Sequence, residues 1–393
     1  MSHDLGAMAT APRTRSRRGR LHLVAPPGTE ERAAPARPLR VVDVAMFYGE
    51  RSGGIRTYLD AKLRWSRGEP GVDHHVVVPG PAATGSMPGR REVRSLRVAA
   101  ANGYRLPLGA GALRRELCAL APDVVLLHDP FWAPLGVART AHALGAQVVV
   151  VHHGSVALDA AGLPGPDRTW APVLRRWMHH AYRDADAVMA ALPTCEDTGR
   201  DADVRLRFGL HPAFRPQGGV RRGDHVLYVG RIAREKGVFE LLHAAARARD
   251  PWPLRLIGSG PAESRLRALA DRLGIAHRVR WRPYVSDPVR LARTYQSART
   301  VVMPGAHETF GLVGFEAAAS GASVVACETA PATAVMEGLA RTYRPGDVDD
   351  LASQIEAARA TSPDLTAARA LAARSTWDAA FTAELADLRS LSA

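Results

Sequence analysis

From residue 39 onward, short apolar runs alternate with segments that carry apolar residues at spacings of three and four. The runs are typical of strands buried on both faces, and the segments between them are typical of helices that bury one face. This alternation predicts parallel sheets with helices on both sides. In the first half, strands are expected at 39–46, 74–78, 123–127, 147–151 and 187–190, and helices at 54–66, 110–120, 136–144 and 170–184.

The alternation stops between residues 191 and 223, where prolines and glycines gather, which indicates an interdomain connection. It then restarts, with strands expected at 225–229, 254–257, 279–281, 300–303 and 323–326. The expected helices are 236–248, 262–273, 288–296 and 312–320, followed by Ala-rich helices from 348 to 391. The chain has 393 residues, enough for two domains of about 150 to 200 residues. We predict an α/β chain of two Rossmann-like domains, divided as 1–38 (a basic arm), 39–215, 216–375 and 376–393 (a last helix).

The overall composition is compatible with several classes of function and selects none of them. No apolar run approaches the length of about 18 residues that a membrane span requires. The net charge of +13 is compatible with nucleic acid, anionic lipid or small anionic substrates. The first 40 residues contribute +5 of it in a Pro/Ala/Arg-rich stretch that we expect to be disordered. Three cysteines, Cys118, Cys195 and Cys327, follow no disulfide or zinc spacing, so a cytoplasmic location is expected.

A first motif places a glycine and two cations between a strand and a helix. Gly230 allows a tight turn after the strand, and Arg231 and Lys236 flank the start of the next helix. The free N–H groups of a helix start favour an anion, so the motif suits a diphosphate. A solvated basic turn is the alternative. Only Lys62 and Lys236 among 52 basic residues are lysine, which favours a specific role for Lys236.

A second motif lies between residues 304 and 321. Its strand delivers Glu308 to the carboxyl edge of a parallel sheet, where ligands of such sheets bind. A helix then opens with amides that can receive phosphate, and Glu316 lies one to two turns inside it. The opening residues are Gly311, Leu312 and Val313. Two acidic residues mean little alone, but their placement around a helix opened by glycine predicts a ligand site.

Together with Gly258-Ser259-Gly260-Pro261, these motifs resemble the donor half of the large retaining GT-B glycosyltransferase family that includes phosphatidylinositol mannosyltransferases and bacterial polysaccharide enzymes, a family 4-like group. The resemblance is specific from about 225 to 330 and weaker from 41 to 224. It implies two Rossmann-like, doubly wound domains with a cleft between them. The segment opening at Ser375 resembles the last helix of this fold, which crosses back onto the first domain.

The resemblance implies a metal-independent, retaining transfer of a hexose, of mannose or glucose type, from a nucleotide diphosphate sugar, with no further cofactor. The acceptor would be a hydroxyl of a glycan, lipid or small molecule. Arg231 and Lys236 would bind the diphosphate and stabilise the leaving group, as preorganised cations do. Glu308 would hold the transferred sugar and Glu316 the ribose. The other donor-binding residues would be Gly53, Gly54, Gly230, Gly258, Gly260, Gly311, Leu312 and Val313.

The first half carries weaker signals. Gly53 and Gly54 open a helix after the first strand and resemble the first loop of the family, although a plain turn is the alternative. His128 and His153 follow strands, which directs them toward the ligand edge, and the resemblance has them contact the sugar or the acceptor. A hydrogen-bonded structural histidine is the alternative. We expect Lys62, on the first helix and away from the strand ends, to matter little for catalysis.

Several features point elsewhere. Asp184-Ala185-Asp186 and Asp201-Ala202-Asp203 resemble the metal-binding DxD of the other glycosyltransferase fold, but polarity at a helix end explains them more simply. The stripe Trp170, Leu174, Trp177 and Ala181 is usual for a core, and its alternative is peripheral contact with an anionic membrane. Competing functions are a GT-B epimerase or phosphorylase, and a nucleic-acid-binding protein. No recognition motif or aromatic platform supports specific nucleic-acid binding.

Overall fold

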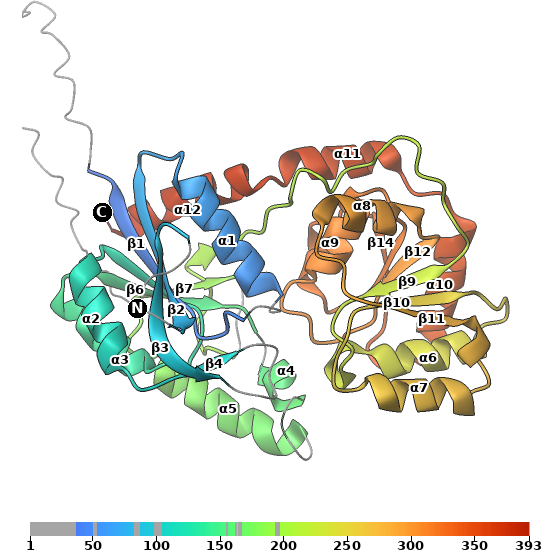
Figure 1. Cartoon of the computed structure of the whole chain (residues 1–393), viewed down its shortest axis with the longest axis horizontal. Helices are drawn as coiled ribbons and strands as arrows, with labels where there is room; N and C mark the ends of the chain where they lie inside the picture. Colours follow the sequence, from blue (N-terminus) through green and yellow to red (C-terminus); the bar gives the residue numbers. More distant parts are fainter. Residues whose placement is uncertain are drawn as a thin grey trace, which may run out of the picture. The chain divides into compact units, whose positions relative to one another are not determined.

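The structure is a computed structural model that describes residues 37–49, 53–81, 87–97, 104–154, 156–161, 163, 167–192 and 197–392. All but the last two residues of the predicted basic arm, 1–38, lie outside this range. The described part contains two sheets, and helices flank each of them (Figure 1). The prediction of an α/β chain with two parallel-sheet halves is therefore confirmed.

The first sheet runs in the order β4-β3-β2-β1-β5-β6-β7-β8 and is parallel except where β4 pairs with β3. Strand order reverses between β1 and β5. Three of its strands, β3, β4 and β8, were not predicted, and β8 falls in the expected interdomain connection. The strands are β1 (Leu39–Val44), β2 (Val72–Gly80), β3 (Arg90–Arg97), β4 (Arg105–Pro107), β5 (Val124–Leu127), β6 (Gln147–His152), β7 (Ala187–Ala190) and β8 (Val204–Arg205).

Alternate residues of this sheet pack on its two faces, as strand geometry requires. Val41 packs with buried side chains of α1 and α12 on one face, whereas Val42 and Val44 pack with α2 and α3 on the other. The helices of this half are α1 (Gly54–Ser66), α2 (Gly111–Leu120), α3 (Pro134–Ala143), α4 (Val156–Ala161) and α5 (Asp167–Ala181), and α12 spans Trp377–Leu391. The short α4 was not predicted.

The second sheet is parallel throughout and runs β11-β10-β9-β12-β13-β14, with its reversal between β9 and β12. This is the strand order of a dinucleotide-binding Rossmann fold. Its strands are β9 (Val226–Val229), β10 (Leu254–Ile257), β11 (Val279–Arg282), β12 (Thr300–Met303), β13 (Val324–Cys327) and β14 (Ala340–Tyr343). The last of these was not predicted, since it contains two polar residues in four.

Helices α6, α7 and α10 contribute to the core on one face of this sheet, and α8, α9 and α11 to the core on the other. The elements are η1 (Arg234–Lys236), α6 (Val238–Arg247), α7 (Glu263–Arg272), η2 (Ala276–Arg278), α8 (Pro288–Ser297), α9 (Leu312–Ala319), η3 (Pro331–Ala334), α10 (Val348–Ala360) and α11 (Leu365–Arg374). The expected Ala-rich region is thus divided into α10, α11 and α12.

The chain passes between the two halves twice, and the two passages touch. Leu210 of the first forms a β-bridge with Thr376 of the second. A Cβ on Gly209 would lie 2.4 Å from the backbone nitrogen of Trp377, so only glycine fits at this crossing. Beyond it, α12 buries Phe381 against the first half. The domain boundaries expected at 215 and 375 remain predictions.

Candidate functional site

Both predicted donor motifs lie where the strand order of the second sheet reverses. Gly230 follows β9 and the segment with Glu308 follows β12, and these strands are hydrogen-bonded neighbours. Their carboxyl ends therefore meet at the edge where sheets of this order bind ligands. The structure brings together two motifs that are far apart in the sequence.

Lys236 and Glu308 form an ion pair at this edge. The Nζ of Lys236 lies 2.9 Å from Oε2 of Glu308, and the two side chains are 24% and 14% exposed. The turn η1 ends at Gly237, whose φ is 67°. A Cβ on Gly237 would lie 2.1 Å from the carbonyl oxygen of Pro304, so only glycine lets η1 approach the loop after β12 so closely. This close approach places the ammonium beside the carboxylate.

Arg231 lies on the same loop and is more exposed. Its Nη1 is 3.2 Å from Oε1 of Glu235, and its side chain is 48% exposed. Tyr228 donates its hydroxyl to the carbonyl of Arg231 at 2.6 Å, which holds the loop against β9. Burial raises the pKa of Tyr104, in the first half, and the charge of Arg231 acts to lower it. An exposed ion pair of this kind contributes little, so Arg231 can turn to an anion at small cost.

Gly258 and Gly260 let the loop after β10 approach the loop after β9. A Cβ on Gly258 would lie 2.0 Å from the carbonyl oxygen of Gly230, and one on Gly260 would lie 2.2 Å from that of Ile232. Packing therefore requires both glycines. The donor-binding role assigned to Gly230, Gly258 and Gly260 stays a prediction.

Helix α9 starts beside these loops. Its N-cap is Gly311, with φ of 101°, and its first turn has neither an acidic residue nor a side-chain cap. The first amides, those of Leu312 and Val313, belong to a helix end that favours an anion. Glu316 follows on the same helix and accepts a hydrogen bond from the hydroxyl of Tyr295 at 2.9 Å. Burial raises the pKa of Glu316 to about 7, although the Tyr295 hydrogen bond opposes the shift.

The predicted glycine loop of the first half reaches α9. Gly53 is the N-cap of α1, and no atom lies within 4 Å of where its Cβ would be. A Cβ on Gly54 would lie 3.2 Å from Cδ1 of Leu312. Arg51 and Ser52 of this loop lie outside the described residues. The structure thus brings Gly54 next to the first residue of α9, with room left at Gly53.

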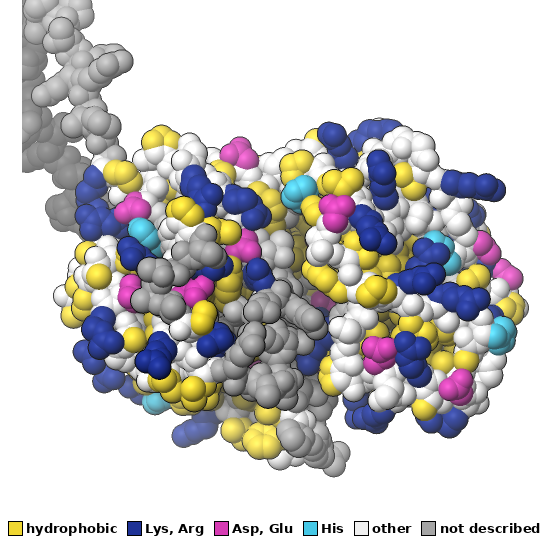
Figure 2. Space-filling view, in the orientation of Figure 1, with side chains coloured by type: hydrophobic (Ala, Val, Ile, Leu, Met, Phe, Trp, Pro, Cys, Tyr) yellow, Lys and Arg dark blue, Asp and Glu magenta, His cyan; other side chains and the backbone are white. Residues whose placement is uncertain are grey.

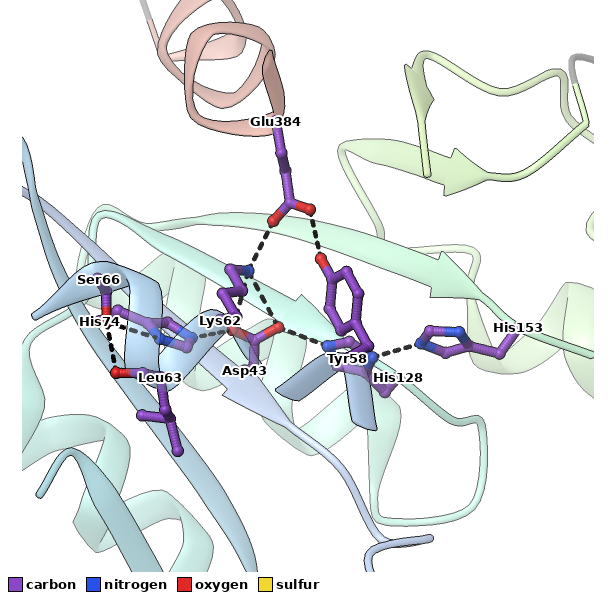
Figure 3. A network of polar contacts seen from close by, with 9 residues as sticks. All are labelled: Asp43, Tyr58, Lys62, Leu63, Ser66, His74, His128, His153 and Glu384. Carbon is purple, nitrogen blue, oxygen red and sulfur yellow. Dashed lines mark hydrogen bonds and ion pairs between the residues drawn. The ribbon is translucent and has the colours of Figure 1, made fainter. Parts of the chain in front are cut away.

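His128 and His153 do meet, but they are buried rather than directed outward as expected. Nδ1 of His128 lies 2.6 Å from Nε2 of His153, and the rings stack with centroids 4.8 Å apart (Figure 3). Nε2 of His128 lies 2.5 Å from Oδ1 of Asp43, near the end of β1. His152 points elsewhere, with its Nε2 3.9 Å from Asp197. The pair sits where the first sheet reverses its strand order, next to β1 and β5.

Lys62, which we expected to matter little for catalysis, has several charged partners in the structure. It is buried on α1, with Nζ 3.0 Å from Asp43 and 2.7 Å from Glu384 of α12 (Figure 3). Asp43 also accepts from His74, and Glu384 from the hydroxyl of Tyr58. The sequence did not reveal this burial, because helix periodicity shows which face is apolar, and a lone lysine on that face is hidden from such a pattern. Removing Lys62 would leave two buried carboxylates without their cation.

The features that pointed elsewhere have structural explanations. Asp186 accepts a hydrogen bond from the backbone N–H of Val148 at 2.7 Å, and Asp203 accepts one from that of Val188 at 2.8 Å. Each DxD-like motif therefore contributes one side chain that is hydrogen-bonded to the backbone near the start of a strand. Along α5, Ala181 is buried, whereas Trp177 is 41% exposed and donates to the carbonyl of Pro130. Among the described residues no group of three or more ligating side chains could hold a metal ion, and none of their helices is long and apolar enough to span a membrane.

On the face shown in Figure 2, Lys and Arg side chains lie over both halves and are interspersed with Asp and Glu. A nucleic-acid-binding surface would be expected to gather them into a stripe or patch.

Known proteins match this chain in both halves. Residues 223–360 match the family model for glycosyl transferases group 1, and residues 52–206 match that for glycosyltransferase family 4. The D-inositol 3-phosphate glycosyltransferase of Mycobacterium avium is 31% identical over 328 residues, which cover 73% of this chain and 75% of that protein. This chain belongs to the family 4-like GT-B glycosyltransferases.

Other similarities agree with this membership. A GDP-mannose-dependent α-(1-6)-phosphatidylinositol dimannoside mannosyltransferase of Mycobacterium tuberculosis is 27% identical over 76% of this glycosyltransferase and 82% of its own length. The sucrose-phosphate synthase of Thermosynechococcus elongatus has the same fold, with a TM-score of 0.68 and 17% identity over 90% of this chain and 94% of that one. Anabaena HepE, solved with UDP and glucose, gives a TM-score of 0.65 at 15% identity, over 90% of this chain and all of that one.

The sequence reasoning missed the polar residues buried behind the histidines of this glycosyltransferase. Asp43 lies in the buried part of the strand Leu39–Val44, among valines, and Glu384 lies in an Ala-rich helix. The available signal was a single acidic residue where a buried strand should have none, since such a residue requires a partner. Its partners are spread along almost the whole chain, so no local spacing reveals them.

Proposed function

We propose that this glycosyltransferase transfers a hexose from a nucleotide diphosphate sugar to a hydroxyl acceptor, with retention of anomeric configuration and without a metal ion. The observation that carries this proposal is the Lys236–Glu308 pair at 2.9 Å, between the strand-order reversal of the second sheet and the start of α9. A cation, a carboxylate and a helix N-terminus at one sheet edge suit the three parts of a donor: diphosphate, sugar hydroxyls and phosphate oxygens.

The proposed leaving group is the nucleoside diphosphate, whose negative charge grows as the glycosidic bond breaks. Lys236, Arg231 and the first amides of α9 would stabilise that charge. Lys236 already has a carboxylate partner, so its ammonium is held in place before the donor binds. Arg231, whose side chain is about half exposed, would break its ion pair with Glu235 when the diphosphate binds. Stabilisation of this kind requires little reorganisation at the moment of reaction.

The two glutamates would each bind a different end of the donor. Glu308, paired with Lys236, would accept hydrogen bonds from hydroxyls of the transferred sugar. Glu316 binds Tyr295 through Oε2, and a carboxylate has capacity for further donors, such as ribose hydroxyls. Their positions on either side of Gly311 support this order along the donor.

The relatives' activities support a hexose of mannose or glucose type. One curated relative is named for GDP-mannose and phosphatidylinositol dimannoside, and another for D-inositol 3-phosphate. For this chain we propose an acceptor with an accessible hydroxyl, of the glycan, lipid or small-molecule class. His153 would contact the sugar or that acceptor, and His128, predicted to do the same, would act through its 2.6 Å contact with His153.

A panel of GDP- and UDP-sugars should be incubated with purified protein, with and without inositol phosphates, glycans and lipid extracts. We expect a new glycoside whose anomeric configuration, read by NMR coupling, equals that of the donor. An inverted product would contradict retention. Isomerised nucleotide sugar or free sugar phosphate as the main product would instead identify an epimerase or a phosphorylase.

A further inference from the structure

Five buried side chains form a continuous polar chain from the last helix to the histidine pair. In order they are Glu384 (α12), Lys62 (α1), Asp43 (β1), His128 (after β5) and His153 (after β6), and we call them the buried relay (Figure 3). Its contacts run 2.7, 3.0, 2.5 and 2.6 Å. Every member is at most 9% exposed. Buried charged groups at such distances are expensive to keep, so their arrangement requires an explanation.

The contacts of the relay limit which atoms of its members can carry a proton. Burial alone raises the pKa of Asp43, but Lys62, His128 and His74 together hold it well below its usual range, so Asp43 is an ionised acceptor. His128 must therefore donate to it from Nε2. Burial, above all, holds the pKa of His153 well below its usual range, so that ring is neutral. If the proton that His128 donates to Asp43 is its only one, Nδ1 of His128 offers a lone pair, and the 2.6 Å contact then requires His153 to donate from Nε2.

This arrangement leaves Nδ1 of His153 without a proton. Among the described residues that nitrogen has no hydrogen-bond partner, whereas Nε2 is engaged. An unprotonated ring nitrogen accepts hydrogen bonds from hydroxyl groups and cannot donate. The same histidine in its other tautomer would present a donor instead. Whether Nδ1 of His153 accepts or donates a hydrogen bond thus depends on Asp43, through His128.

We propose that His128 carries a single proton, on Nε2 toward Asp43, and that Asp43, Lys62 and Glu384 are positioning residues that hold His153 as the Nε2–H tautomer. Nδ1 of His153 then accepts a hydrogen bond from a substrate hydroxyl. The kinetic consequence of this inference rests on the proposed transfer function, whereas the tautomer itself does not. The hydroxyl can belong to the transferred sugar or to the acceptor.

Helix α12 reaches the histidines by two routes. Glu384 binds Lys62, which holds Asp43, and it also accepts from the hydroxyl of Tyr58. The Tyr58 ring lies edge-on to His153, with centroids 6.1 Å apart, and is tilted against His128 at 5.9 Å. The packing of α12 on the first half and the orientation of the histidine rings therefore depend on the same side chains.

The first test reads the proton positions. Full-length protein with ¹⁵N-labelled histidine is studied by long-range ¹H–¹⁵N NMR, with His153 assigned through His153→Gln. We expect the wild-type proton on Nε2. In Asp43→Asn, the amide oxygen should stay with the two donors Lys62 and His74, which turns the NH₂ group toward His128. His128 must then accept at Nε2 and donate from Nδ1, and His153 should become the Nδ1–H tautomer. A proton on Nδ1 in wild type, or an unchanged tautomer in folded Asp43→Asn, would overturn the inference.

A second variant covers the case in which Asp43→Asn does not fold. Glu384→Gln removes one charge of the relay, and Asp387→Asn is its matched control on the same helix. Asp387 pairs with Arg207 at 2.5 Å and touches no relay member. Glu384→Gln should lower transfer by about tenfold, as expected for one substrate hydrogen bond, with unchanged affinity for nucleoside diphosphate. Asp387→Asn should stay within about twofold of wild type.

The outcomes separate the possible failures. Equal losses of transfer and of Tm in Glu384→Gln and Asp387→Asn would show that α12 only needs to be docked, and the inference would fail. Comparing deoxy sugars with acceptors that lack single hydroxyls, in wild type and Glu384→Gln, identifies which hydroxyl His153 binds. A protein without transfer activity but with the expected tautomers would refute the proposed function and leave the positioning role supported.

Discussion

Replacing Lys236 by alanine tests the donor site most directly. Its ammonium lies 2.9 Å from Glu308 and is only 24% exposed, so it is partly desolvated and held in place. A hydrogen bond to a charged group contributes about 1.5 to 3 kcal/mol, which corresponds to a factor of about 10 to 150. The contribution increases as charge develops on the leaving group, so kcat/KM should fall by about 10² or more.

The assay is transfer at subsaturating donor, and the control must remove a cation without breaking a buried network. Lys62 cannot serve, because it neutralises Asp43 and Glu384. Arg272 is exposed in the last turn of α7, and Arg272→Ala should leave kcat/KM unchanged. Lys236→Arg should rescue only partly, since a planar fork replaces a compact charge.

The ligand series provides a second control. Lys236→Ala should weaken the binding of nucleoside diphosphate much more than that of nucleoside monophosphate, if the ammonium faces the second phosphate. Near wild-type transfer by a folded Lys236→Ala protein would show that the diphosphate site is placed wrongly. Equal weakening for both nucleotides would show that Lys236 supports the fold of the site rather than the phosphate.

Four further predictions follow from the same site. Glu316→Ala should weaken the binding of free nucleotide, while Glu308→Ala should spare it and lower transfer; equal effects on nucleotide affinity would refute the assignment. Because burial raises the pKa of Glu316 from 4.5 to about 7, its protonated form stabilises the fold, and this contribution is lost as pH rises through that range. The Tm of wild type should therefore fall relative to that of Glu316→Gln between pH 5 and pH 8, as read by circular dichroism, and a constant difference would contradict the shift. Gly258→Ala, whose Cβ would lie 2.0 Å from a carbonyl oxygen, should lower Tm and abolish donor binding, whereas Gly218→Ala, with no atom within 4 Å, should behave as wild type. Transfer should survive EDTA, and loss of turnover that Mn²⁺ or Mg²⁺ restores would show that a metal is needed.

The sequence was most informative where one physical pattern dominates. Strands such as Val124–Leu127 and Thr300–Met303 are continuous apolar runs, because both faces of a parallel strand are buried. The donor motifs could be placed for a related reason. A glycine after a strand, followed by a helix, predicts the carboxyl edge of a sheet without any knowledge of the partner strands.

Strands at and near the sheet edges could not be found in this way. β3 reads RREVRSLR, and its exposed arginines hide the alternation of Val93 and Ser95 toward the core. β3 lies next to the three-residue edge strand β4. Charged residues are usual near such edges, since they oppose pairing with another chain, but in a sequence they resemble a loop. The short strands β8 and β14 could not be predicted either, because their pairing in the folded sheet defines them rather than their composition.

The buried relay could not be predicted from the sequence for a different reason. Its position also shows that the two halves of the enzyme carry different kinds of polar group. Apolar periodicity predicts which face is buried but not which polar groups meet there, and Lys62 and Glu384 are more than 300 positions apart. In each half, the polar groups lie where the strand order of the sheet reverses. The second half offers cations and helix amides, which suit a leaving diphosphate, whereas the first offers a histidine pair with a carboxylate behind it, which suits a hydroxyl. We therefore expect changes at Lys236 to act on the donor diphosphate, and changes at Glu384 to act on hydroxyl recognition without altering nucleotide affinity.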